Sequence, residues 1–271
     1  MSGKKRASPG ADNEKNGDPL VGVDIGEEEF KKLQAVQQEI QRVELVLERR
    51  AQEALTPVYQ KRREALKAID KFWPVALTHH SLIAYSAQHD ADRLALSYLE
   101  DVWVVRESRE PKVFTLEFTF KENPYFSDAV LKKEYKFEPS NASADETPDA
   151  DGITPSMLEF SWERDVTPQS TTIHWKDATK NLTKLYPLVV DDEDSEAIAD
   201  PGSFFNFFES NKDFNDVSVT IANEIFPDAI QYFTGEMGDS DSEDEDSDED
   251  LGDEEEEIDL EKPRAKKAKN V

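Results

Sequence analysis

The chain has 271 residues and a formal net charge of −28 at pH 7, because 60 acidic side chains outnumber 32 basic ones. A surface of this sign repels phosphate backbones and attracts basic proteins, which disfavours direct nucleic-acid binding by the body of the protein. The absence of cysteine excludes disulfides and thiolate metal sites, and no apolar run is long enough to suggest a membrane-spanning helix.

The first 26 residues contain glycine, proline and charged residues without hydrophobic periodicity. Such a composition cannot bury enough apolar surface to offset the loss of chain entropy. We therefore predict a disordered N-terminal arm over residues 1–26.

Residues 27–71 are predicted to form one long helix. The segment has no glycine and a single proline, and its apolar residues recur at spacings of three and four, as in a coiled coil. This apolar seam consists of Leu33, Val36, Ile40, Val43 and Leu47. A helix on the order of 65 Å long exceeds the width of the domain that the remaining residues can build. We therefore expect the seam to pair with a second copy in an antiparallel homodimer.

Pro57 interrupts the helical pattern, because proline removes a backbone hydrogen bond and crowds the preceding turn. We expect a kink at this position. The alternative is two separate helices that break at Pro57.

Residues 72–236 are predicted to form an α+β domain. Apolar and polar residues alternate in 113–120 and 131–137, a pattern typical of antiparallel strands with one buried face. Further strands are expected at 101–105, 158–162 and 171–175. Short helices are expected at 81–87, 90–99, 203–208 and 216–226, the last two with aromatic residues that cover the dry face of the sheet. Residues 139–156 and 190–202 are predicted to be flexible loops.

Residues 237–271 are predicted to be a disordered acidic tail with a basic terminus. The tract 239–261 contains sixteen acidic residues and no basic one, and residues 27–238 still carry a net charge of −17 without it. A flexible polyanion on an acidic body implies a strongly basic partner such as a histone. The alternative is a tail that only keeps the protein soluble.

Two kinds of short signal lie in this tail. Three serines have an acidic residue three positions further on, as acidophilic kinases of the casein-kinase type require: Ser240, Ser242 and Ser247. Five basic residues form a cluster that fits a nuclear-import peptide for an import receptor: Lys262, Arg264, Lys266, Lys267 and Lys269. The alternative for this cluster is a counter-charge that folds back on the acidic tract.

An enzyme is not expected. No glycine occurs between Gly26 and Gly152, so the phosphate-cradling loops of nucleotide-binding enzymes are missing from that part of the chain. The histidines do not fit a known metal-ligand spacing, and acidic pairs are too frequent to identify an acid–base pair. We expect no cofactor and no catalytic residue.

The order of several motifs resembles the nucleosome assembly protein family, and within it the SET subgroup. After the long helix come FKENPYFSDAVLKKEYKF (120–137), IHWK (173–176), PGSFFNFFES (201–210), EIFPDAIQYF (224–233) and an acidic tail. The resemblance covers about residues 27–236. It implies an earmuff-like α+β domain, dimerisation through the long helix, and ATP-independent deposition or removal of core histones. It also implies a nuclear protein, with shuttling to the cytoplasm as an alternative, that meets nucleic acid mainly through histones.

By position, the resemblance assigns the histone-facing surface to acidic residues near the C-terminal helices. These residues are Glu209, Asp213, Asp216, Glu224 and Asp228. The segment 122–126 matches a strand-connecting motif with a structural role. The chain departs from the SET pattern in a longer 139–170 insert and in its basic terminus. A regulatory binder that inhibits a serine/threonine phosphatase, as some SET-type proteins do, is the alternative function.

Overall fold

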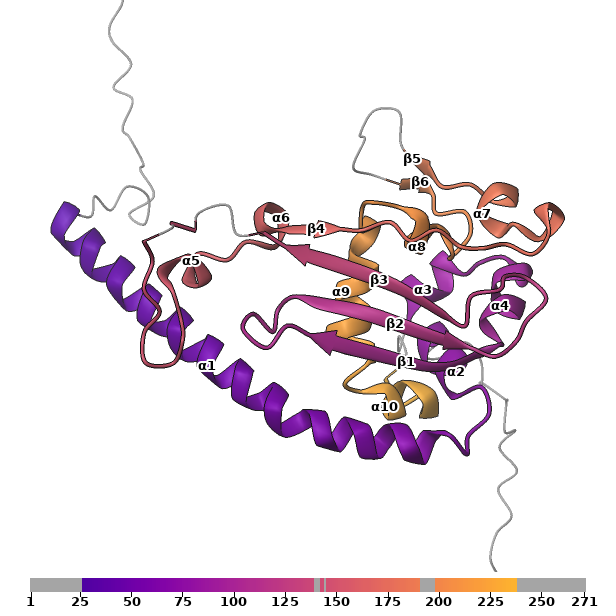
Figure 1. Ribbon diagram of the computed structural model, residues 1–271, viewed down its shortest axis with the longest axis horizontal. Helices are drawn as coiled ribbons and strands as arrows, with labels where there is room; N and C mark the ends of the chain where they lie inside the picture. The colour runs from indigo at the N-terminus through magenta and orange to yellow at the C-terminus, as the bar shows by residue number, and fades with distance from the viewer. Residues whose placement is uncertain (1–25, 139–141, 144, 191–197, 238–271) are drawn as a thin grey trace, which may run out of the picture.

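A computed structural model describes residues 26–138, 142–143, 145–190 and 198–237. The fold is α+β: a long N-terminal helix is followed by an antiparallel sheet, and short helices cover one face of that sheet (Figure 1). This architecture confirms the expected fold class. No described helix combines the length and the apolar character needed to cross a bilayer.

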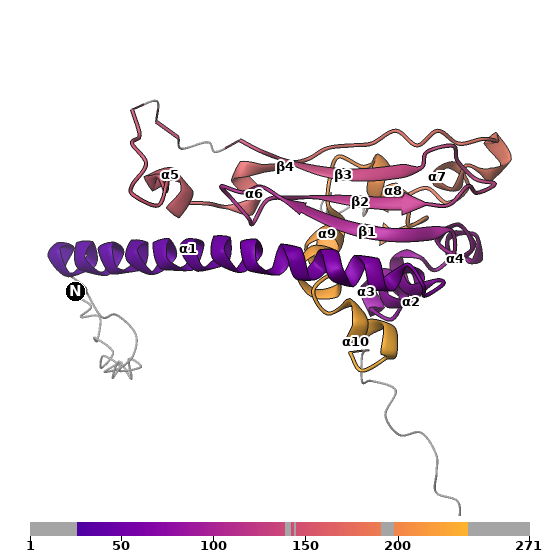
Figure 2. The same ribbon diagram turned by 60° about the horizontal axis from the view of Figure 1, so that its bottom comes forward.

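The long helix α1 spans Glu27–Leu66, which is 40 residues. It is continuous through Pro57, so the alternative of two separate helices is wrong. Proline has no N–H, so the carbonyl of Glu53 loses its helical donor at Pro57. One residue earlier, the Thr56 hydroxyl donates to the Gln52 carbonyl oxygen at 2.7 Å. The helix ends at Leu66, before the expected residue 71, and Lys71, which takes a left-handed conformation with φ 57°, precedes the next helix. In both views α1 runs along the β1 side of the sheet, and its N-terminal half extends beyond the sheet (Figures 1 and 2).

The main sheet has four strands in the order β1-β2-β3-β4, all antiparallel. Their bounds are β1 Leu99–Arg106, β2 Phe114–Phe120, β3 Val130–Phe137 and β4 Val166–Pro168. The strands predicted at 101–105, 113–120 and 131–137 are therefore confirmed. Side chains of β2 alternate between buried and half-buried along its whole length, as the sequence pattern indicates.

Two predicted strands are wrong. Residues 158–162 instead connect two single-turn helices, α5 Pro155–Leu158 and α6 Trp162–Asp165. Proline suits the first position of α5, and the buried Asp165 carboxylate accepts from the Ser161 N–H at 3.0 Å to close the turn of α6. Residues 171–175 make only an isolated bridge, between Phe126 and Trp175.

Short helices pack on one face of the sheet, behind the strands in Figure 1. They are α2 Phe72–Thr78, α3 Ser81–Ser86, α4 Asp90–Leu96, α8 Asn206–Glu209, α9 Val217–Thr220 and α10 Ala229–Thr234. Aromatic rings join the layers, for example Phe118 and Phe208 with centroids 5.1 Å apart. The aromatic residues of 203–208 thus cover the dry face, as predicted. The segment 216–226 is helical, but it continues from α9 into a π-helical turn, Ile221–Ile225.

The remaining elements are short. They are the 3₁₀ turns Ala178–Lys180 and Phe214–Asp216, the helix α7 Leu182–Leu185, and the strands β5 Val189–Val190 and β6 Ile198–Asp200. β5 and β6 pair with each other, so the predicted loop 190–202 contains strand residues at both ends. In the 122–126 motif the buried Asn123 side chain accepts from the N–H groups of Tyr125 and Phe126 at 2.9 and 3.0 Å, which is a structural role.

Candidate functional site

The apolar seam of α1 is exposed. Its five residues keep between 46% and 57% of their surface accessible: Leu33, Val36, Ile40, Val43 and Leu47. Phe30 and Val58 continue the same stripe towards both ends of the helix. Full burial of one such side chain is worth about 1.5–3 kcal/mol, so a continuous uncovered stripe is an energetic reason for association.

The five predicted acidic residues do not form one solvated surface. Glu209 is half-buried, and its Oε1 accepts from the Trp175 indole N–H at 3.3 Å and from the Ile173 N–H at 3.4 Å. Its carboxylate therefore holds the segment before Lys176 in place.

Asp213 also turns inward. Both of its carboxylate oxygens accept from the Ser218 N–H at 3.3 Å, and the Ser218 hydroxyl donates to Oδ2. Burial raises the pKa of Asp213. These bonds close a turn in which Asn215 and Asp216 both have positive φ angles, 57° and 53°. Asp213 is thus part of the structure that presents the helices after it.

A buried lysine beneath this turn was not found by sequence reasoning. Lys133 is 0% exposed and its Nζ donates to the Ser210 carbonyl oxygen at 2.6 Å. Burial lowers its pKa to about 8. Alternation along β3 places Lys133 on the buried face with Leu131 and Tyr135, while Lys132 and Lys136 are exposed, so this pattern could have identified it.

Asp216, Glu224 and Asp228 remain available to solvent. Asp216 and Glu224 are exposed and Asp228 is half-buried. The Glu224 carboxylate lies 3.6 Å from His80 Nε2. These three residues lie along the stretch from the turn before α9 to the start of α10.

An open groove with a volume of about 460 Å³ adjoins Asp216. It brings together carboxylates from distant parts of the chain, because Glu48 of α1 and Glu163 of α6 also line it. Arg106 and Lys112 lie in the same groove, so its lining contains both positive and negative groups. Sequence reasoning did not single out Glu163, because it follows directly on a segment, 158–162, that was predicted to be a strand.

The predicted phosphorylation sites and the predicted import cluster lie outside the described residues. This applies to Ser240, Ser242 and Ser247, and to the basic residues from Lys262 to Lys269.

A protein-family model described as nucleosome assembly protein (NAP) matches residues 26–236. The match covers the long helix, the sheet and the covering helices.

Individual proteins are also similar to the chain. The chain is 29% identical over 227 residues to Protein SET of Drosophila melanogaster, which covers 82% of this chain and 75% of that protein. It is 27% identical over 250 residues to NAP1-related protein 1 of Oryza sativa subsp. japonica, covering 87% and 84%. The crystal structure of Ccp1 superposes with a TM-score of 0.57 at 25% identity, covering 79% of this chain and 98% of that one.

Proposed function

Because the chain belongs to the nucleosome assembly protein family, we propose that it is a histone chaperone of the SET subgroup. It binds core histones through acidic surfaces and promotes nucleosome assembly and disassembly without ATP. It is not an enzyme, and it acts in the nucleus. The observation that carries this proposal is the acidic excess, −28 overall, on a family fold that leaves Asp216, Glu224 and the half-buried Asp228 accessible to solvent.

The small free energy of each exposed ion pair suits a protein that binds histones and later releases them. One exposed ion pair contributes only about 0–1 kcal/mol, since water and salt screen it. Many such pairs acting together give useful affinity, and each can be exchanged separately for a DNA phosphate. A histone held in this way is shielded from aggregation and can still be transferred.

The working unit is proposed to be a homodimer paired along the α1 stripe. The stripe residues are exposed and contiguous, and the helix extends beyond the sheet, so its own domain does not cover them. An antiparallel pair would bury the stripe of both copies and place two acidic domains on either side of the helices.

Truncation of the chain after Met237 tests the contribution of the acidic tract. We expect weaker binding of core histones and a shallower dependence on salt between about 50 and 200 mM, because sixteen carboxylates are removed. Fluorescence titration of labelled histones measures both quantities, and light scattering checks that the dimer persists. An unchanged affinity and salt slope would mean that the tail only solubilises the protein. A flat salt response of the full chain would favour a binder that does not work through charge, such as a phosphatase regulator.

A further inference from the structure

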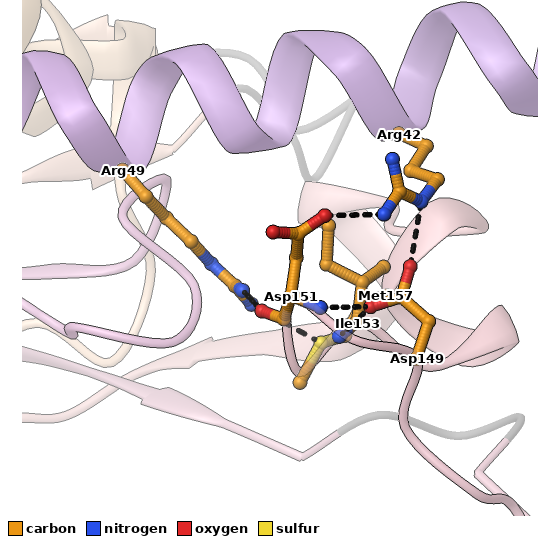
Figure 3. A network of polar contacts seen from close by, with 6 residues as sticks. All are labelled: Arg42, Arg49, Asp149, Asp151, Ile153 and Met157. Carbon is orange, nitrogen blue, oxygen red and sulfur yellow. Dashed lines mark hydrogen bonds and ion pairs between the residues drawn. The ribbon is translucent and has the colours of Figure 1, made fainter.

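The face of α1 opposite the apolar stripe is held by the 145–158 segment, which belongs to the predicted insert (Figure 3). Arg42 Nε donates to Asp149 Oδ2 at 2.6 Å, and its Nη2 pairs with the Asp151 carboxylate. One guanidinium on the helix thus binds two carboxylates from a segment more than a hundred residues away in the chain.

A second arginine, two helical turns further on, ties α1 to the same segment and to the sheet. Arg49 Nη1 donates to the Asp151 carbonyl oxygen at 2.9 Å. Its Nε and Nη2 donate to the Arg109 carbonyl oxygen, in the turn between β1 and β2, at 2.9 and 2.5 Å. The arginine therefore bridges three parts of the fold.

The segment is folded to receive these arginines. Asp149 Oδ1 accepts from the N–H groups of Asp151 and Ile153 at 2.8 and 2.9 Å, which closes a tight turn. Ile153 is only 3% exposed, and Leu45, between the two arginines on α1, is 1% exposed. Neither residue belongs to the main hydrophobic core of the domain. Each side of the contact therefore buries one apolar residue outside the main core, next to the charge-assisted hydrogen bonds of Arg42 and Arg49.

The position of this contact along α1 determines what it can do. Leu45 and Leu66 are the only buried residues of the helix. At 3.6 residues per turn, Arg42, Leu45 and Arg49 share one face, while Ile40, Val43 and Leu47 point to the opposite side. The 145–158 segment thus contacts the middle of α1 on the face opposite the apolar stripe.

We propose that the 145–158 segment is a strut that fixes the angle at which α1 leaves the α+β domain. Without it, α1 would be held only by the hydrogen bonds of Arg49 to the Arg109 carbonyl and by the packing nearer its C-terminal end, with nothing to hold Arg42 and the turns before it. In the proposed dimer this angle sets the spacing of the two acidic domains, a consequence that rests on the proposed function. The strut itself is a property of one chain.

Intramolecular distance measurement by electron paramagnetic resonance tests the strut directly. The chain has no cysteine, so Glu28→Cys at the start of α1 and Glu134→Cys on β3 give the only two spin-label sites. Labelled protein is diluted with unlabelled protein so that pairs within one chain dominate. We expect a narrow distance distribution in the parent, and a width that roughly doubles in Arg42→Ala/Arg49→Ala.

The matched control is Arg50→Ala, which removes an exposed arginine of the same helix and should leave the distribution narrow. Asp149→Asn/Asp151→Asn removes the carboxylate charges without changing α1 and should broaden the distribution in the same direction. Circular dichroism verifies that each variant is folded. Narrow and unchanged distributions in both double variants would overturn the proposal. The measurement needs neither histone nor a second copy, so failure of the proposed function would not affect it.

Discussion

Replacing Ile40 and Leu47 of α1 by glutamate is expected to convert the protein from a dimer into a monomer. Both side chains are about half exposed in the single chain, at 46% and 57%, and the proposed dimer would bury them. An unpaired charge in such a seam costs roughly 3–5 kcal/mol, and the pair of chains would contain four of them. Light scattering at micromolar concentration gives the mass directly. Thermal unfolding of the domain should change little, because neither residue belongs to its core.

The matched control adds the same charge on another face of α1. Gln34 and Gln38 are exposed and lie away from the stripe, so Gln34→Glu/Gln38→Glu should remain dimeric. A dimer that survives Ile40→Glu/Leu47→Glu would show that α1 is not the interface.

Reversing the three solvent-accessible acidic residues near α9 and α10 is expected to weaken histone binding roughly tenfold or more, even in a protein that ends at Met237. The variant is Asp216→Lys/Glu224→Lys/Asp228→Lys, which changes the local charge by six units. Glu209 and Asp213 are left intact, because their carboxylates bond inside the protein and their loss would disturb the fold. Titration with labelled core histones measures the effect.

The control for this variant must carry the same charge change at a distance. Glu28→Lys/Glu39→Lys/Glu122→Lys meets this requirement, since all three residues are exposed and lie outside α9 and α10. Glu48 is unsuitable because it lines the groove that contains Asp216. Equal losses in the two triple variants would mean that binding follows net charge alone, and no defined histone surface would remain.

The features that sequence predicted well are those with a simple local period. The α1 seam repeats every three or four residues, and β2 alternates at every residue, so each pattern has one consistent interpretation. The 158–162 segment also alternates, yet it lies between two short helices. Its alternation is too short to outweigh Pro155 at a helix start and the Asp165 carboxylate bonded to the Ser161 N–H.

The candidate site was harder to predict because side-chain partners decide which carboxylates face water. Asp213 and Asp216 are the same residue type three positions apart, but the Asp213 carboxylate accepts a hydrogen bond from the Ser218 hydroxyl and points into the protein. Likewise, Arg42 on a helix rich in charges gives no sign that its partner is Asp149, which is 107 residues away. Contacts of this kind follow from the tertiary fold, and a single sequence contains no periodic signal for them.

The most direct test of the central claim is a histone–DNA aggregation assay at physiological salt without ATP. Core histones and DNA are mixed with and without purified protein, and turbidity and nucleosome formation are followed together. A histone chaperone is predicted to keep the mixture soluble and to increase the yield of nucleosomes in proportion to its concentration. Precipitation that is equally fast with and without the protein, under conditions in which the protein is folded, would contradict the account.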